Sequence, residues 1–565
     1  MASALRVWSQ MEHGMKARFF RLQAVAFAML LFGLVAGEPA HAQEGEEARR
    51  CIDLRGLAVE QGRVVAASFE RVGAFRSPDK AQLPALPSFC RVVILSASEP
   101  GSRIVSELWL PLGAAWNGKL LGTGNGGFAG AIRYNVLAGG VKRGFAVANS
   151  DMGTAPAHSA AIWYEAGNGQ PVMIRDWGHR ATHLMTVAAK EIVRRYYGKA
   201  QRHAYFFGCS TGGHQGLSEA QRYPGDYDGI LAGAPGHNRT HLHAAFNYNF
   251  QKAQATKARE LPAAKANLFR TAALAHCGGK DGGAPGEPFL NAPLACRFDP
   301  ARLACKSGQE ASSCLTAGDV TILQSFFAGA RNPRTGERIY FPFLPGSETQ
   351  AAPLFGNPQS LASRAPGDLA SWATDGVAAS DRFDFDRDLD RLDATWGADI
   401  NALDPDLSLF SGRGGKLILY HGWEDGVVSP LDSVAYFEAV RGGPLKRDRF
   451  ARLYMVPGMG HCTGGPGPRP LTLEDMPDDD FPDDELLAVL DRWVEGNVPP
   501  AVLTAYAFEE GELRATRPLC AYPAVPRYMG TGSPEKAASF ACVRAAPLAF
   551  EHPSPRYLFG TQGAR

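Results

Sequence analysis

The chain has 565 residues, of which 45% are hydrophobic and 20% are charged. This composition supports a large buried core and excludes a disordered chain. Lys and Arg number 58 and Asp and Glu number 57, so the formal net charge of +1 gives no bulk electrostatic reason to expect nucleic acid or an anionic membrane as a partner.

The first residues have the pattern of a signal peptide. A basic stretch over residues 16–21 precedes an apolar run over residues 22–37, and an Ala-x-Ala sequence ends at Ala42. This order predicts a signal peptide over residues 1–42, cleaved after Ala42. The alternative is a membrane anchor, but the run is shorter than the roughly 20 residues that a span needs. We expect a secreted or periplasmic protein with no membrane segment after cleavage.

Ten cysteines follow the predicted cleavage point. An even number of cysteines in an exported chain predicts five disulfides. The alternative is a metal site. The sequence has no Cys-x-x-Cys, and neither His179/His183 nor His237/His241 has the Glu of a zinc motif, so zinc is not expected. The cysteines are Cys51, Cys90, Cys209, Cys277, Cys296, Cys305, Cys314, Cys462, Cys520 and Cys542.

Strand and helix patterns alternate in two blocks of the chain. The first block predicts strands at 91–96, 104–111, 119–121, 144–150, 204–208 and 229–234, and helices at 177–197 and 215–223. The second predicts strands at 416–421 and 452–456, and helices at 432–440 and 486–494. Residues from about 240 to 410 are rich in Ala, Gly and Pro and are expected to be irregular. The order predicts one α/β domain with a large insertion.

The sequence Gly208-Cys209-Ser210-Thr211-Gly212 is a G-x-S-x-G motif. By chance alone the motif is weak, but here it follows a predicted buried strand and precedes a predicted helix. That context is typical of a nucleophile elbow, in which a strained turn exposes the serine hydroxyl. Ser210 is therefore the candidate nucleophile, and the backbone N–H of Thr211 a candidate oxyanion donor.

A serine nucleophile needs a base and a group that orients the base. In the α/β-hydrolase order the acid and then the histidine follow the serine. Asp425 follows the strand predicted at 416–421, and His461 lies in a Gly-rich loop after the strand at 452–456. Each candidate follows the carboxyl end of a strand, where sites of open α/β sheets form. The rival acid is Glu424, and the rival bases are His421 and His214.

Two cysteines flank these candidates. Cys209 directly precedes Ser210, and Cys462 directly follows His461. If the serine and the histidine meet, the two cysteines must also be close, and a disulfide there would hold the catalytic pair in register.

Cys209-Ser210, Asp425 and His461-Cys462 resemble the CS-D-HC signature of the tannase/feruloyl esterase family. The resemblance extends over nearly the whole mature chain, including 116–118, 122–130, 223–235, 416–468 and 516–523. It implies an α/β-hydrolase fold with a large lid inserted between nucleophile and acid. The implied parts are a hydrolase domain over residues 43–240 and 411–565, and a lid over residues 241–410.

The resemblance also implies roles for individual residues. Ser210 would be the nucleophile, His461 the base, Asp425 the orienting acid, and Thr211 and Gly127 the backbone oxyanion donors. No catalytic cofactor is implied. The implied disulfides are Cys51–Cys90, Cys209–Cys462, Cys277–Cys296, Cys305–Cys314 and Cys520–Cys542.

The family's lid usually binds structural calcium through an Asp-rich loop. Here the loop after Cys277 departs from that pattern, because Gly278 replaces the first Asp and two residues are inserted before Glu287. Calcium binds six to eight oxygens, so the loss of a carboxylate weakens such a site. The expected ligands are Asp281, Glu287 and the carbonyls of Gly283 and Phe289; the alternative is a plain loop.

The expected substrate is a small aromatic ester. A phenolic acid such as ferulate or gallate is the first acyl group, and a terephthalate monoester is the alternative. Arg364 would bind the free carboxylate of a terephthalate. Phe128, Trp372 and Trp423 are candidates for stacking on an aromatic acyl group, but packing is the favoured interpretation for each of them taken singly.

Two other classes of protein compete with the esterase hypothesis. Gly122-x-Gly124-x-x-Gly127 matches a dinucleotide-binding motif, but no clear amphipathic helix and no closing acidic residue follow it. A non-catalytic binding protein on a hydrolase fold would need a blocked pocket. A peptidase or lipase is disfavoured by the resemblance. The oligomeric state is not predicted.

Overall fold

The computed structural model describes residues 44–128, 130–155, 171–351, 382–442, 446–474, 483–545 and 548–554. The predicted signal peptide, Arg364 and Trp372 lie outside these ranges. Within them, no helix combines the length and the apolarity that crossing a membrane requires.

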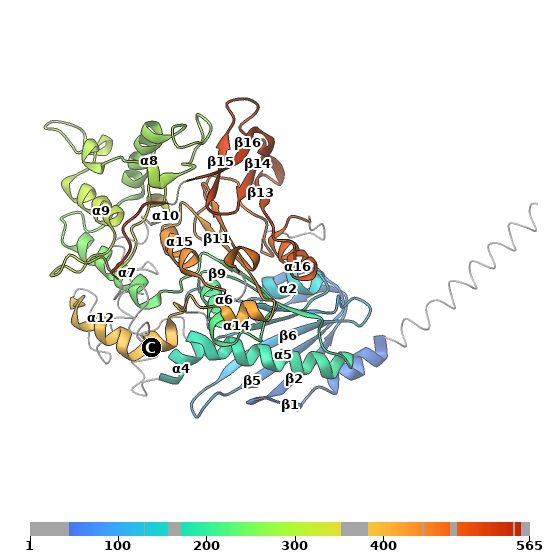
Figure 1. Ribbon diagram of the computed structural model, residues 1–565. Helices are drawn as coiled ribbons and strands as arrows, with labels where there is room; N and C mark the ends of the chain where they lie inside the picture. The colour runs from blue at the N-terminus through green and yellow to red at the C-terminus, as the bar shows by residue number, and fades with distance from the viewer. Residues whose placement is uncertain are drawn as a thin grey trace, which may run out of the picture.

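A ten-stranded mixed sheet forms the centre of the fold (Figure 1). Its strands pair in antiparallel fashion on one side, up to the pair of β6 with β8, and in parallel fashion from β8 onward. The prediction of an α/β fold is therefore confirmed. In spatial order the strands are β1 (Ala58–Val59), β2 (Gly62–Glu70), β5 (Phe89–Ser96), β6 (Ile104–Pro111), β8 (Ala146–Ser150), β7 (Lys119–Thr123), β9 (His203–Cys209), β10 (Gly229–Gly233), β11 (Lys416–Gly422) and β12 (Ala451–Val456).

Helices cover both faces of the sheet and bury two separate apolar clusters. Successive side chains of a strand point to opposite faces, so Phe206 of β9 joins one cluster while Tyr205 and Phe207 join the other. The first face is covered by α5 (Ala181–Tyr197), α6 (Thr211–Arg222) and α15 (Pro430–Ala439), and the second by α2 (Tyr134–Lys142) and α16 (Leu486–Gly496).

The predicted strands fall where the structure has them, but one helix was missed. Helix α2 follows the Gly-rich loop, where no clear amphipathic helix was expected. Gly139 and Gly140 weaken the helical pattern of α2. A Cβ on Gly140 would lie 2.6 Å from a side-chain carbon of Val147, so close packing on the sheet requires glycine there.

The stretch between β10 and β11 is more helical than its composition indicated. Its Ala-rich segments form helices that lie to the left of the sheet in Figure 1, and helix α7 begins directly beside the elbow loop. The expectation of an irregular block was therefore wrong in this respect. The elements are α7 (Arg239–Gln254), α8 (Ala263–Cys277), η2 (Pro293–Ala295), η3 (Pro300–Leu303), η4 (Ala311–Ser313), α9 (Ala317–Ala328), α10 (Glu348–Ala351), α12 (Arg387–Leu392), η7 (Asp393–Gly397), α13 (Ala398–Ile400) and α14 (Ser408–Gly412).

Smaller elements complete the described chain. Two C-terminal hairpins, β13–β14 and β15–β16, lie above the sheet in Figure 1. Helix α5 is preceded by a π-helical turn, η1, which carries Trp177. The bounds are β3 (Gly73–Arg76), β4 (Gln82–Leu86), α4 (Pro171–Arg175), η1 (Asp176–Arg180), η8 (Arg447–Arg449), β13 (Val502–Glu509), β14 (Glu512–Cys520), β15 (Ala524–Tyr528), η9 (Ala537–Ser539) and β16 (Phe540–Arg544).

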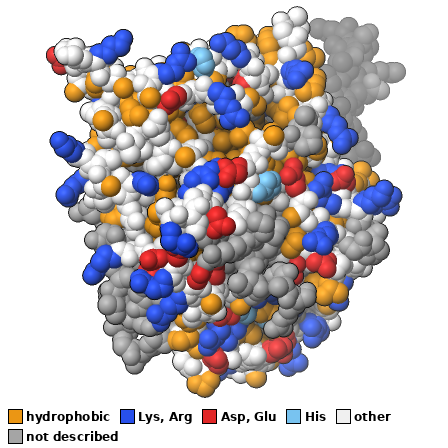
Figure 2. Space-filling view, turned by 60° about the vertical axis from the view of Figure 1, so that its left-hand side comes forward, with side chains coloured by type: hydrophobic (Ala, Val, Ile, Leu, Met, Phe, Trp, Pro, Cys, Tyr) orange, Lys and Arg blue, Asp and Glu red, His pale blue; other side chains and the backbone are white. Residues whose placement is uncertain are grey.

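The face shown in Figure 2 carries basic and acidic side chains interspersed with one another. This mixture agrees with the formal net charge of +1. A surface of mixed sign does not provide the continuous basic stripe that tracks a nucleic-acid backbone.

Candidate active site

Ser210 lies in a strained turn between β9 and α6. Its φ of 62° and ψ of −117° fall in a region that residues with a Cβ rarely adopt. The neighbouring glycines make this turn possible. A Cβ on Gly208 would lie 2.6 Å from the backbone of Gly212, and a Cβ on Gly213 would lie 2.3 Å from the carbonyl oxygen of Gly233. The turn therefore has the geometry of a nucleophile elbow.

A hydrogen-bonded chain joins the three residues that the sequence singled out. Ser210 Oγ lies 2.8 Å from His461 Nε2, and His461 Nδ1 lies 2.7 Å from Asp425 Oδ2. The three residues, Ser210, His461 and Asp425, follow β9, β12 and β11, which belong to the parallel part of the sheet, with β10 between β9 and β11. Residues 251 positions apart, Ser210 and His461, are thus brought into direct contact.

Asp425 is fully buried and accepts hydrogen bonds on both oxygens. One oxygen accepts the backbone N–H groups of Val427 and Val428 at 2.7 and 2.9 Å, and the other faces His461 and His421. Burial by itself would raise the pKa of Asp425. The attraction of His461 and the hydrogen bonds from His421 and His461 outweigh burial and hold that pKa well below its usual range. Asp425 is therefore an anion that can stabilise a charged His461.

The rival residues have other partners. Glu424 points away from His461 and pairs with Arg270 of α8 at 3.0 Å. His421 contacts Asp425 on one side and Ser433 Oγ on the other, at 2.9 and 2.8 Å. His214 is fully buried beside the ring of Trp177. His421 is thus a second partner of Asp425, a contact that sequence reasoning missed.

The Gly-rich loop after β7 packs directly on the elbow. A Cβ on Gly124 would lie 2.5 Å from Cα of Gly212, and Gly212 N–H donates to the carbonyl of Asn125 at 2.7 Å. Gly127, with φ of +55°, places its carbonyl 2.7 Å from the hydroxyl of Thr211. Thr211 is the first residue of α6, so its N–H has no acceptor within the helix. The two oxyanion candidates therefore lie next to each other.

The described residues contain five disulfides and no free cysteine. Cys209 and Cys462, which flank Ser210 and His461, form a bond across a sequence separation of 253 residues. The elbow and the histidine loop are thereby joined covalently. The other bonds are Cys51–Cys90, Cys277–Cys296, Cys305–Cys314 and Cys520–Cys542.

Gln350 of α10 is a contact of the histidine loop that the sequence did not reveal. Its Oε1 accepts the backbone N–H of His461 at 2.9 Å. A Cβ on Gly460 would lie 1.5 Å from the amide nitrogen of Gln350, so the loop accommodates this side chain only because residue 460 is glycine. No local signal marks Gln350, because it lies 111 positions before its partner.

The two described aromatic candidates are buried in different places. Phe128 packs against Trp177 and His243, with ring centroids 5.3 and 5.6 Å apart. Trp423 lines a small apolar cavity of about 30 Å³ together with Met455 and the segment 522–526. Arg364 and Trp372, the other two candidates, lie outside the described residues.

The acidic groups of the expected calcium loop already have partners. Asp281 accepts the backbone N–H groups of Asn291 and Ala292 at 2.6 and 3.0 Å. Glu287 accepts the N–H of Ala284 and forms an ion pair with the buried Arg517. A guanidinium therefore supplies the positive charge beside Glu287. This donor set does not fit the six to eight free oxygens that calcium prefers.

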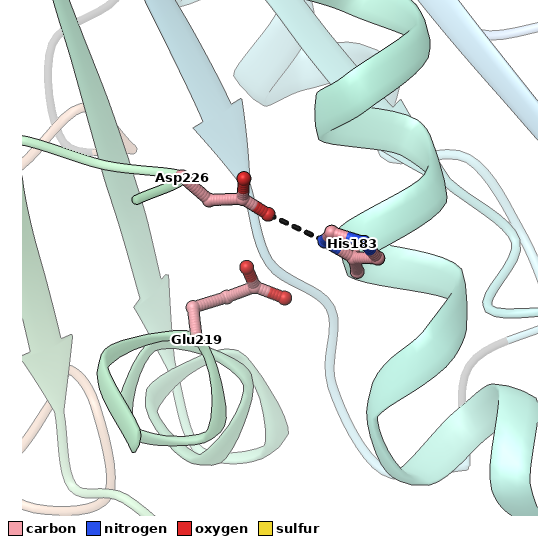
Figure 3. Close-up of side chains that lie close together, drawn as sticks. All are labelled: His183, Glu219 and Asp226. Atoms are coloured by element: carbon pink, nitrogen blue, oxygen red, sulfur yellow. Dashed lines mark hydrogen bonds and ion pairs between the residues drawn. The ribbon is translucent and has the colours of Figure 1, made fainter. Parts of the chain in front are cut away.

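Another acidic cluster lies at the end of helix α6 that is far from the elbow. In Figure 3 the carboxyl groups of Glu219 and Asp226 face each other beside His183. Asp226 has His183 at 2.6 Å and Lys190 at 3.6 Å, whereas neither buried oxygen of Glu219 has a hydrogen-bond partner among the described residues. Burial and the nearby Asp226 raise the pKa of Glu219 well above its usual range. The raised pKa fits a pair in which Glu219 and Asp226 share a proton.

A serine–histidine–aspartate chain at the carboxyl edge of a parallel sheet is typical of esterases with the α/β-hydrolase fold. Residues 90–543 match the family described as tannase and feruloyl esterase. The chain belongs to the tannase and feruloyl esterase family, and it is a carboxylic ester hydrolase.

Individual proteins agree with this assignment. An uncharacterized esterase of Xanthomonas campestris pv. campestris is 38% identical over 89% of this chain and 93% of its own length. The mono(2-hydroxyethyl) terephthalate hydrolase of Piscinibacter sakaiensis is 31% identical over 85% of this chain and 89% of its own length. A crystal structure of an esterase from Aspergillus oryzae superposes with a TM-score of 0.80 at 26% identity, covering 88% of this chain and all of that chain.

Proposed function

We propose that this protein is an exported serine esterase that hydrolyses esters of aromatic acids. Ser210 is the nucleophile, His461 the general base and then acid, and Asp425 the residue that orients His461. The observation that carries the proposal is the pair of contacts at 2.8 and 2.7 Å that link these three side chains. Each contact is within the reach that proton transfer and orientation require.

The proposed reaction has two half-reactions. Ser210 Oγ attacks the ester carbonyl while His461 Nε2 takes the hydroxyl proton, and the anionic Asp425 stabilises the imidazolium that forms. The negative charge on the carbonyl oxygen is held by the N–H groups of Thr211 and Gly127. The alcohol leaves with the proton from His461. Water then attacks the acyl-enzyme by the same route and releases the acid. No step needs a cofactor.

The family supports an aromatic acyl group, with phenolic acids such as ferulate or gallate as the first class. A terephthalate monoester is the second candidate, because one relative of 31% identity is named as a hydrolase of such an ester. Export through the signal peptide at residues 1–42 is also proposed, and five disulfides support an oxidising compartment.

The test is hydrolysis of methyl ferulate, methyl gallate and mono(2-hydroxyethyl) terephthalate by purified residues 43–565. The Ser210→Ala variant is expected to lose turnover by at least about 10³-fold. Ser218→Ala is the matched control. Ser218 lies on the same helix, and its buried hydroxyl has no hydrogen-bond partner among the described residues, so full activity is expected.

The possible outcomes test the proposed nucleophile and the proposed substrate class independently. Turnover that depends on Ser210 supports the nucleophile, and the preferred ester identifies the acyl class. If a fluorophosphonate labels Ser210 but none of the three esters is hydrolysed, the proposed substrate class is wrong. Activity that survives in Ser210→Ala would contradict the proposed nucleophile.

A further inference from the structure

Arg239, the first residue of helix α7, is a buried cation with no counter-ion among the described residues. Only 5% of the residue is exposed. Among the residues that the structure describes, no carboxylate lies within ion-pairing distance of its guanidinium, and its Nε has no hydrogen-bond acceptor. Desolvation lowers the pKa of Arg239 to about 9, so the group is still charged at neutral pH. Such a charge lowers the stability of the folded state, so its presence points to a function that offsets this cost.

The guanidinium of Arg239 donates a hydrogen bond to the elbow. Arg239 Nη2 donates to Thr211 Oγ1 at 2.5 Å. The Thr211 hydroxyl donates in turn to the carbonyl oxygen of Gly127 at 2.7 Å. A hydroxyl has one proton, so the direction of both bonds is determined: from Arg239 to Thr211 to Gly127.

Trp177, in the turn η1 before helix α5, contacts both Arg239 and Gly127. Its ring lies under the guanidinium of Arg239, with Cζ 5.0 Å from the ring centroid. Its Nε1 also donates to the carbonyl of Gly127 at 3.4 Å. The carbonyl of Gly127 therefore accepts two hydrogen bonds. This carbonyl belongs to the peptide between Gly127 and Phe128, so the two bonds hold Gly127 against Thr211 and restrict rotation between that peptide and the N–H group of Gly127.

We propose that Arg239 is a positioning residue of the oxyanion hole. Through the Thr211 hydroxyl it fixes the N–H groups of Thr211 and Gly127 relative to each other. Its charge, which no carboxylate neutralises, favours the anionic transition state over the neutral ester. This inference rests on the proposed function, because it assigns a role toward the same two oxyanion donors.

The proposal predicts that replacing Arg239 changes stability and activity in opposite directions. Replacing a buried arginine that only supports packing would lower the melting temperature and leave kcat unchanged. Replacing an uncompensated charge that serves catalysis has a different effect on stability. A neutral side chain of similar length removes the desolvation penalty of the charge. Activity then falls while the melting temperature is retained or raised.

The test compares Arg239→Met and Arg239→Lys with the wild type, using p-nitrophenyl acetate so that the aromatic pocket plays no part. We expect Arg239→Met to lower kcat about 10- to 100-fold with KM changed less than about threefold, because loss of a whole oxyanion donor costs about 10²–10³. Arg239→Lys, which keeps the charge, is expected to recover part of the loss. The rate of fluorophosphonate labelling should fall in parallel with kcat.

Arg222→Met is the matched control. Arg222 lies at the other end of α6, and its Nη2 donates to the carbonyls of Ala398 and Asn401. Its replacement should lower the melting temperature and leave kcat unchanged. If Arg239→Met behaves like Arg222→Met, Arg239 is a packing residue and the proposal is overturned.

A second measurement tests the route through the hydroxyl. Thr211→Val removes the hydroxyl but keeps the backbone N–H and the shape of the side chain. If Arg239 acts partly through Thr211, the double variant of Arg239→Met with Thr211→Val should lose less activity than the two single losses combined, whereas fully additive losses would contradict the proposal. Absence of wild-type turnover and labelling would instead overturn the proposed function, and this inference would fall with it.

Discussion

Two adjacent acids have opposite surroundings, one at the carboxyl edge of the sheet and the other against the proposed lid, the segment inserted between β10 and β11. Asp425 faces two histidines and two backbone N–H groups, and its pKa is held well below its usual range in spite of burial. Glu424, one residue earlier, faces α8 of the lid. Burial raises the pKa of Glu424 to about 7, and Arg270 opposes that rise only in part. Burial alone thus does not determine whether a carboxyl group is charged, because the number of hydrogen-bond donors around it also shifts its pKa.

The largest expected effect is at Asp425. Asp425→Asn keeps the shape but removes the charge that orients His461, so kcat should fall by about 10⁴. Glu424→Gln, the neighbouring control, should change kcat by less than about threefold, because Glu424 does not touch the triad. Steady-state kinetics on the preferred ester checks both variants. Equal losses would mean that the two acids act as one unit.

The next effect concerns the covalent tie between the two catalytic loops. The double variant Cys209→Ala with Cys462→Ala should lose about 2–5 kcal/mol of stability, together with most of its activity, because Ser210 and His461 are no longer held in register. The control is Cys305→Ala with Cys314→Ala, a pair only 9 residues apart in the lid. Urea unfolding and kcat are the readouts. Full activity in the first variant would show that this disulfide does not organise the site.

The stability of the proposed lid should depend on Arg517 rather than on added calcium. Removing Arg517 leaves the carboxylate of Glu287 buried and unpaired, so Arg517→Gln should cost about 3–5 kcal/mol. Treatment of the wild type with EGTA should leave the melting temperature unchanged. A melting temperature that falls with EGTA and recovers with Ca²⁺ would reinstate the calcium loop.

The smallest effect is the pH dependence that Glu424 imposes on stability. A raised carboxyl pKa means that the folded protein binds the proton more tightly than the unfolded chain. This group therefore lowers stability as pH rises from about 4.5 through about 7. Glu424→Gln should match the wild type near pH 4 and be more stable by about 1–3 kcal/mol at pH 8. Parallel stability curves across that range would refute the raised pKa.

The sequence predicted the sheet side of this comparison better than the lid side. Ser210, Asp425 and His461 each follow a short apolar strand and lie in a Gly-rich or polar loop, so local pattern was enough to propose them. The helices α7 to α9 were not predicted, because their Ala-rich segments lack a clear apolar stripe.

Contacts between distant residues were beyond sequence reasoning. Arg239 reaches Thr211 across 28 positions, and Gln350 reaches His461 across 111. No spacing rule connects such pairs, because they meet only after the strands that carry the loops are ordered in the sheet. The partner of Glu287 is likewise Arg517, which lies 230 positions later in a C-terminal hairpin.

The bond between Cys209 and Cys462 also has a topological consequence. It encloses β10, the lid and β11 in one covalent ring, because its ends are 253 positions apart. Proteolysis within the lid would therefore give two polypeptides that remain attached through this bond. One would carry Ser210 and the other Asp425 and His461, with the proposed nucleophile and the proposed base still tethered to each other. A nicked molecule would run as a single species until a reductant separated it.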